Sequence, residues 1–173
     1  SVKSQMADCC ALWVHAVSVG EVMVAMSLID KIKQQWPNQN IVLTVTTKTG
    51  YQLATEKLKG KVLVLPSPLD FRSTVQEFIR TIKPKVYISI ETEIWPNLFT
   101  HLKKNSIPIL IVNGRISDVS LGRYQLVKGL LKPALGAVWC FCMQSKLDQE
   151  RIIELGAEAS KVEVCGNVKF DDM

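Results

Sequence analysis

The chain has 173 residues, of which 47% are apolar and 21% are charged, a composition that excludes disordered and fibrous proteins. Its length predicts a single domain over 1–173. The net charge of +5 comes from scattered lysines with few interleaved aromatics, which favours a solvated basic surface over a dedicated binding site. If that surface has a function, phosphates of a ligand or anionic lipid headgroups suit it as well as nucleic acid.

Membrane-spanning, secreted and disulfide-rich classes are also disfavoured. No apolar run approaches the roughly 18 residues that a transmembrane helix needs, and 1–10 lacks the apolar centre of a signal peptide. The five cysteines show no C-x-x-C spacing, which favours a reducing compartment. Cys140 and Cys142 alternate with Phe141 in an expected strand, so buried thiols are favoured over metal or redox use.

Strand-like and helix-like segments alternate along the chain. Apolar, β-branched runs predict strands at 12–17, 40–46, 61–65, 85–91, 107–112, 137–143 and 162–165. The segments between them predict helices at 21–35, 49–59, 73–83, 96–105, 120–132 and 146–155. This β-α-β alternation with short connections predicts a Rossmann-like, doubly wound α/β fold with a mainly parallel sheet.

The first predicted strand is followed directly by Ser18, Gly20 and Glu21. Gly20 is expected to permit a tight turn, with Glu21 in the first turn of the next helix. Ligands of open α/β sheets bind outside the carboxyl ends of the strands. Glu21 is therefore either a general base or an acid that favours a helix N-terminus for structural reasons. Ser18 and the N–H groups around Gly20 are candidates to bind a phosphate or carboxylate.

A second acidic strand end follows 85–91. Glu91 and Glu93 lie two residues apart, so an extended backbone would place both on one side, where two ionised carboxylates repel. One of them is expected to pair with a cation or a hydrogen-bond donor, and Arg115 after the next strand is the natural candidate. A structural Glu–Arg network and a catalytic site are both compatible with this pattern.

Two further segments have open interpretations. The helix after Glu21 is apolar around much of 22–29, which predicts either an exposed patch for a lipid or partner or a helix buried on both sides. The loop at 66–72 is either a connection near the ligand crevice or a rigid link in which Asp70 or Ser73 caps the next helix.

The two histidines are isolated in the sequence. His15 is expected to be a hydrogen-bonded core residue of the first strand, and His101 a surface residue. There is no H-E-x-x-H, no paired-cysteine spacing and no Asp-x-Asp at a strand end. The sequence therefore predicts no metal site.

Four motifs resemble those of a known family. They are WVHAVSVGE at 13–21, ETEIWPN at 91–97, NGRIS at 113–117 and GNVKFD at 166–171. Similar motifs occur in this order in the 3-deoxy-D-manno-octulosonic acid (Kdo) transferases of lipopolysaccharide synthesis. The resemblance implies a GT-B glycosyltransferase, built from two Rossmann-like domains that face each other across a cleft. It implies that this chain is the N-terminal half, without the C-terminal domain and without the membrane-anchoring segment of many members.

The resemblance also implies a reaction and roles for residues. The N-terminal domain would bind the lipid A precursor, and the C-terminal domain would bind the donor CMP-Kdo. Transfer would be inverting and would use no metal or other cofactor. Glu21 matches the family's catalytic base and Glu91 its second required acid, whereas Glu93, Arg115 and Lys169 match further motif positions.

The same resemblance implies a peripheral enzyme at the cytoplasmic face of the bacterial inner membrane, with no nucleic-acid partner. Arg115, Lys169 and the turn at 18–20 are candidate contacts to the acceptor's phosphates. Two alternatives stay open: half of another GT-B lipid or nucleotide-sugar enzyme, and a non-catalytic α/β module that binds anions at Gly20.

Overall fold

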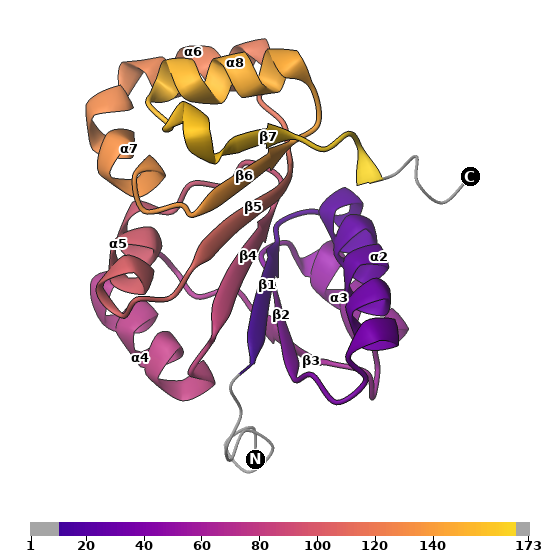
Figure 1. The fold of residues 1–173 in the computed structure, drawn as a ribbon. Coiled ribbons are helices and arrows are strands. Elements are labelled where there is room, and N and C mark those ends of the chain that lie inside the picture. Colours follow the sequence, from indigo (N-terminus) through magenta and orange to yellow (C-terminus); the bar gives the residue numbers. More distant parts are fainter. Residues whose placement is uncertain (1–10, 169–173) are drawn as a thin grey trace.

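The computed structural model describes residues 11–168 and shows a seven-stranded sheet in which all neighbouring strands are parallel (Figure 1). The strand order is β3-β2-β1-β4-β5-β6-β7. The strands are β1 (Leu12–Ala16), β2 (Ile41–Val45), β3 (Leu63–Pro66), β4 (Val86–Ile90), β5 (Ile109–Gly114), β6 (Cys140–Met143) and β7 (Val162–Val164). The predicted doubly wound α/β fold is confirmed.

Helices connect the strands. They are α2 (Val19–Gln35), α3 (Lys48–Lys57), α4 (Arg72–Ile82), α5 (Pro96–Lys104), α6 (Asp118–Leu126), α7 (Lys128–Leu135) and α8 (Lys146–Leu155), followed by a short 3-10 turn, η1 (Ala159–Lys161). In the part of the chain that the structure describes, no helix is both long and apolar enough to cross a bilayer.

Helices cover both faces of the sheet, α2 and α3 on one side and α4 and α5 on the other (Figure 1). Successive strand residues therefore point into different cores. Trp13 and Tyr87 belong to the core under α4 and α5, whereas Val14 and Ile88 belong to the core under α2 and α3. Burial on both faces explains why the strands are continuous apolar runs in the sequence.

The segment predicted as one helix at 120–132 is two helices, so this prediction was wrong. α6 begins earlier because the Ser117 hydroxyl accepts a hydrogen bond from the Ser120 N–H at 3.2 Å. Val127, at φ −116° and ψ 17°, interrupts the helix before α7. Apolar spacing continues across this break, so periodicity alone could not reveal it.

His101 was also predicted wrongly, because it is only 4% exposed. It shares the buried face of α5 with Leu98 and Leu102, three residues before it and one after it. Its Nδ1 lies 2.9 Å from the carbonyl oxygen of Asn97, which satisfies one ring nitrogen within the helix.

The cysteines of β6 lie on one face of the strand, as the alternation predicted. Cys140 and Cys142 are half-buried, with their sulfur atoms 4.0 Å apart. Burial is the main cause that raises the pKa of the Cys142 thiol to about 12, so it stays protonated and unreactive at neutral pH. Cys165 is exposed, and 9–10, with the remaining two cysteines, lies outside the described residues.

Candidate functional site

Two acidic junctions lie side by side at the carboxyl edge of the sheet. β1 and β4 are paired parallel neighbours, in a register that runs from Leu12 opposite Val86. Glu21 follows β1 and Glu91 follows β4, and the negative charges of both act on the carboxyl of Glu93. Glu21 and Glu91 therefore share one edge, as the fold prediction required. We call Glu21, Glu91 and Glu93 the acidic cluster.

Glu21 is held in a capping box at the start of α2. Its Oε2 accepts the Val17 N–H at 2.8 Å, and its Oε1 accepts the Ser18 hydroxyl at 2.8 Å and the Ser18 N–H at 3.2 Å. In return the Glu21 N–H donates to Ser18 Oγ at 3.3 Å. The side chain is only 6% exposed. These bonds fix the carboxylate in one orientation.

The tight turn predicted at Gly20 is wrong. α2 begins at Val19 with Ser18 as its cap, so Gly20 lies in the first helical turn, and its φ is not among the positive glycine values. The Ser18 N–H and hydroxyl both donate to Glu21, so the donors expected to grip a phosphate already bind a carboxylate of this chain.

The Glu91–Glu93 loop is held in an unusual backbone conformation. Glu91 has φ 59°, a left-handed value that is uncommon for a non-glycine residue and that clusters at functional sites. Thr92 anchors the loop: its hydroxyl accepts the Arg115 N–H at 3.0 Å, and its carbonyl accepts the Tyr124 hydroxyl at 3.0 Å. β5 and α6 thus position the acids that follow β4.

Glu93 differs from an ordinary glutamate in its affinity for a proton. Burial, followed by the charges of Glu21 and Glu91, raises its pKa to about 7. The repulsion predicted between neighbouring carboxylates is therefore relieved in part by a proton on Glu93. A carboxyl with a pKa near neutrality can both accept and donate a proton at working pH.

Of the two predicted cations, the structure describes Arg115 but not Lys169. Arg115 is exposed directly after β5, beside the Glu91–Glu93 loop. Lys169 lies outside the described residues, but Val168 before it is held at this edge, because its N–H donates to Asn113 Oδ1 at 3.2 Å. An ion pair between Arg115 and the acidic cluster stays a prediction.

Sequence reasoning missed Asn113, which organises this edge. It is 2% exposed and has φ 58°. Its side-chain oxygen accepts the Val168 N–H, and its carbonyl accepts the Gln144 amide at 2.9 Å. The signal was present as Asn113–Gly114 at the end of a predicted strand, because Asn tolerates left-handed backbone.

Asp70 caps a different helix from the one predicted. Its Oδ1 accepts the Leu98 N–H at 2.8 Å and its Oδ2 accepts the Asn97 N–H at 3.1 Å, so it caps α5. The next helix, α4, begins after Phe71 with no side-chain cap. Neither Asp70 nor Ser73 therefore caps the next helix, so that part of the prediction was wrong. The loop leaves Leu69 and Phe71 exposed, at 67% and 65%.

His15 lines a small cavity together with Asp70 and Trp95. The cavity measures ≈ 10 Å³, about the space of one water molecule. His15 Nδ1 lies 2.9 Å from Thr44 Oγ1, but His15 Nε2 and the nearby Trp95 Nε1 have no partner among the described residues. The predicted hydrogen-bonded core histidine is therefore only half satisfied. Burial lowers its pKa to about 4, which keeps it neutral at physiological pH.

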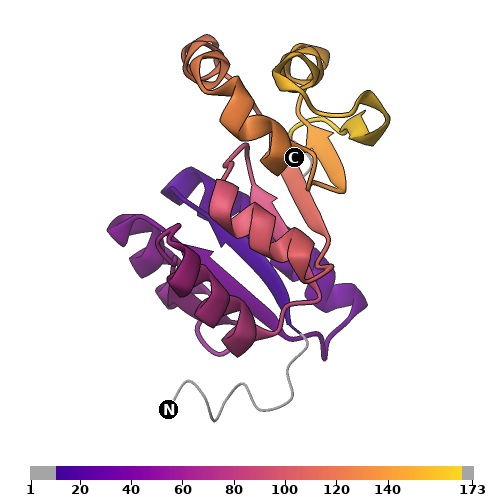
Figure 2. The same cartoon turned by 90° about the vertical axis from the view of Figure 1, so that its left-hand side faces the viewer.

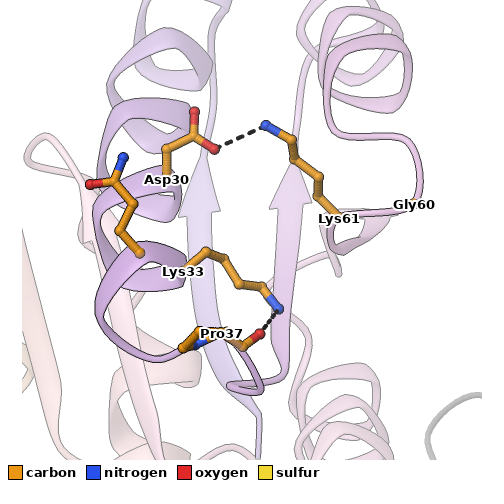
Figure 3. Close-up of a pocket in the computed structure, with 6 residues that line it drawn as sticks. Asp30, Lys33, Pro37, Gly60 and Lys61 are labelled. Atoms are coloured by element: carbon orange, nitrogen blue, oxygen red, sulfur yellow. Dashed lines mark hydrogen bonds and ion pairs between the residues drawn. The ribbon is translucent and has the colours of Figure 1, made fainter.

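A wider pocket of ≈ 620 Å³ lies at the other edge of the sheet, between the C-terminal end of α2 and the start of β3 (Figure 3). Both lysines that line it already have partners within the domain: Lys61 forms an ion pair with Asp30 at 3.1 Å, and Lys33 donates to the Pro37 carbonyl at 3.2 Å. This pocket is therefore separate from the acidic cluster.

The sequence of this domain matches the model of a known family. The family model of 3-deoxy-D-manno-octulosonic-acid transferase (kdotransferase) matches residues 2–172. The chain belongs to this family. The four motifs that carried the resemblance are therefore motifs of a Kdo transferase family member.

Relatives of this family member match nearly its whole length. It is 42% identical over 161 residues to the bifunctional glycosyltransferase/methyltransferase of Fusobacterium nucleatum, covering 92% of the chain and 25% of the relative. It is 33% identical over 160 residues to the 3-deoxy-D-manno-octulosonic acid transferase of Haemophilus influenzae, covering 92% of the chain and 38% of the relative. The chain thus spans well under half of these relatives.

Solved structures share the fold. The UDP-GlcNAc 2-epimerase of Neisseria meningitidis, bound to UDP-GlcNAc, superposes with a TM-score of 0.63 at 11% identity, over 93% of this chain and 47% of that one. The UDP-GlcNAc 2-epimerase of Methanocaldococcus jannaschii gives 0.62 at 13% identity, over 91% and 45%. This Kdo transferase family member therefore has the fold of one half of a GT-B protein.

The acidic cluster of this family member has no obvious metal partner within the described part of the chain. Between residues 11 and 168, no group of three or more His, Cys, Asp or Glu side chains has an arrangement that could hold a metal ion. Metal-independent transfer stays a prediction.

Proposed function

We propose that this chain is the acceptor-binding domain of a Kdo transferase, which transfers Kdo from CMP-Kdo to the lipid A precursor at the cytoplasmic face of the bacterial inner membrane. The observation that supports it is the acidic cluster at the carboxyl edge of a kdotransferase-family domain. Ligands of open α/β sheets bind at this edge. A second domain, outside this chain, would hold CMP-Kdo opposite it.

Glu21 is the proposed base. A carboxylate has about four lone-pair directions, and the three donors around Glu21 leave one of them on Oε2. An acceptor hydroxyl can donate to that position. Because the carboxylate is fixed before substrate arrives, little reorganisation is needed to bring base and hydroxyl into line.

The proposed step balances with one proton transfer. The glucosamine hydroxyl oxygen attacks the anomeric carbon of Kdo, and its proton moves to Glu21. The bond from that carbon to the phosphate oxygen of CMP breaks, and CMP leaves with the electron pair. Attack from the face opposite the leaving group inverts the anomeric configuration.

Glu91 and Glu93 would act around this base. Glu93, with its pKa raised to about 7, can donate a hydrogen bond from its protonated form to an acceptor oxygen. Glu91 adds to the negative field of the cluster, which favours the proton on Glu93. The loop that carries both acids is anchored through Thr92, so its position at the edge is fixed.

The acceptor would bind through cations and exposed apolar side chains at the same edge. Arg115 is the described cation there, and a lipid A precursor carries phosphates. Most of the apolar side chains of 22–29 are buried in the core between α2 and the sheet, but Met23 is 52% exposed. Leu69 and Phe71, on the loop that caps α5, are the more exposed apolar side chains at this edge and are the proposed contacts to acyl chains.

An assay of the full-length protein tests the proposal. It should transfer Kdo from CMP-Kdo to a tetra-acylated lipid A precursor, and the transfer should persist in EDTA. Replacing CMP-Kdo by a UDP-sugar should give no product. Transfer from the UDP-sugar instead would assign the domain to another GT-B enzyme, and a need for added magnesium would overturn metal independence.

A further inference from the structure

The outer side of α6 and α7 carries a second apolar face. Val119, Gly122 and Leu126 follow one another at spacings of three and four residues, which places them along one side of α6, and Leu130 lies on α7 after the break at Val127. Val119, Leu126 and Leu130 are exposed at 65%, 87% and 73%. An added Cβ at Gly122 would meet nothing within 4 Å, so this side faces open space.

This apolar face is separate from the one that holds the helices on the domain. Leu121 and Tyr124 pack against the core from α6, and Leu131, Ala134 and Leu135 do so from α7. Exposed single apolar residues are ordinary, but here they gather on helices that already have a buried side. We call Val119, Leu126, Val127 and Leu130 the α6–α7 ridge. The ridge contributes nothing to the described core.

The segment that carries the ridge has charge of one sign, while Glu154 of α8 lies beside it and accepts the Gln125 amide at 2.7 Å. From Val119 to Leu135 the sequence holds three cations and no acidic residue, and all three cations are exposed: Arg123, Lys128 and Lys132. Asp118, just before this segment, forms an ion pair with Arg151 of α8. An apolar face accompanied by exposed cations fits an anionic lipid surface, where apolar side chains enter the headgroup boundary and cations meet lipid phosphates.

The helix α6, which carries the first part of the ridge, contacts the loop of the acidic cluster through its core-facing side. α6 starts at the carboxyl edge, two residues after Ile116 at the end of the β5 connection, and its Tyr124 hydroxyl donates to the Thr92 carbonyl between the two acids. Figure 2 shows α6 and α7 in orange at one end of the molecule. The ridge is therefore carried by a helix that begins at the edge where the acceptor would bind.

We propose that the α6–α7 ridge docks the protein on an anionic bilayer. This deepens the proposed function, because a docked ridge would hold the acidic cluster close to a lipid-embedded acceptor, but bilayer binding does not depend on Kdo transfer. The three exposed cations of the segment, Arg123, Lys128 and Lys132, disfavour pairing with the same face of a second copy, since like charges would meet.

Cosedimentation of the 173-residue chain with vesicles tests the docking. We expect binding to vesicles of phosphatidylethanolamine and phosphatidylglycerol, and much weaker binding to neutral phosphatidylcholine. Leu126→Glu with Leu130→Glu should weaken binding at least about tenfold, because two apolar contacts become charges of the wrong sign. Lys128→Gln with Lys132→Gln should weaken it about fivefold for each cation at low salt.

Trp36→Glu is the matched control, since Trp36 is exposed at 55% on the turn after α2, away from the ridge. It should bind vesicles like the wild type. Unchanged binding by the double leucine variant, with thermal unfolding like that of the wild type, would overturn the proposal. So would a wild-type dimer that this variant converts to a monomer, because the ridge would then be an interface between copies.

The full-length enzyme separates this inference from the proposed function. With acceptor in detergent micelles, the double leucine variant should keep wild-type turnover, whereas with acceptor in anionic vesicles it should lose about tenfold. If the double leucine variant loses vesicle binding while the wild type transfers no Kdo, the docking surface would be upheld and the proposed reaction rejected. Equal turnover of variant and wild type on vesicles would reject a role for the ridge in presenting the enzyme to its acceptor.

Discussion

The β1 and β4 junctions carry the same acidic side chain on the same edge, but hold it in different ways. After β1, Glu21 accepts three hydrogen bonds from residues within four positions of it. After β4, Glu93 is half-buried beside two other carboxylates, and its pKa is raised to about 7. The first arrangement fixes the orientation of a carboxylate, and the second favours a carboxyl that holds its proton.

The difference shows that donors and burial, rather than residue type, divide the tasks of an acidic cluster. A fixed carboxylate suits the acceptance of a proton from a hydroxyl. A carboxyl that is protonated near neutrality suits the donation of a hydrogen bond. Exchanging these roles would require a change in the capping box or in the loop after β4.

The largest expected effect is the loss of turnover in Glu21→Gln of the full-length enzyme. If Glu21 is the base, turnover should fall about 10²- to 10⁴-fold, with little change in acceptor affinity, because a base acts in the transition state. Steady-state kinetics and acceptor binding measure the two quantities. Glu56→Gln, on the exposed side of α3, is the control and should be silent. Near-normal turnover of Glu21→Gln would move the role of base to Glu91 or Glu93.

The next effect concerns how His15, in β1, makes the free energy of unfolding depend on pH. Burial lowers the pKa of His15 to about 4, so between about pH 6.5 and 4 the unfolded chain binds more protons than the folded one. Stability should therefore fall as the pH drops through this window, by on the order of 3 kcal/mol. Urea unfolding of the wild type and of His15→Gln measures it, and the variant should lose most of this dependence. Equal dependence in both proteins would show that His15 is not the group responsible.

Arg115→Ala should act on the acceptor alone. A charge-assisted contact to phosphate is worth roughly 1.5–3 kcal/mol, so the acceptor KM should rise about ten- to a hundredfold. The affinity for CMP-Kdo should stay nearly unchanged, because the donor would bind in the other domain. Arg80→Ala, an exposed arginine at the far end of α4, is the matched control. A parallel loss of CMP-Kdo affinity would place Arg115 at the donor instead.

The smallest effect is on stability at the β4 junction. The raised pKa of Glu93 means that the folded chain binds more protons than the unfolded one between about pH 4.5 and 7. Glu93 should therefore destabilise the fold progressively as the pH rises through this window. Glu93→Gln should raise the melting temperature by about 2–4 °C at pH 8, after allowance for solvent screening, and by less at pH 5. Calorimetry at both pH values tests this, and an equal gain at both would mean that Glu93 carries no raised pKa.

The sequence by itself determined the architecture and part of the β1 junction. Alternating strand and helix signals, with apolar strand cores, led to the parallel doubly wound sheet, because both faces of every inner strand had to be covered. The capping box was also available in the sequence: Ser18 and Glu21 form its S-x-x-E pattern, and its bonds join residues that are local in the chain. The expectation of a glycine turn there overlooked this local signal.

Only the tertiary structure decided how the rest of the site is built. Asp70 caps α5 from 27 residues away, and Thr92 is anchored by Arg115 and Tyr124 from later elements. The proton affinity of Glu93 depends on burial and on the charge of Glu21. Glu21 follows β1 and Glu93 follows β4, which β2 and β3 separate in the sequence but which are paired in the sheet. Such effects depend on distances between side chains that are remote in the chain, and those distances exist only after the strands have paired.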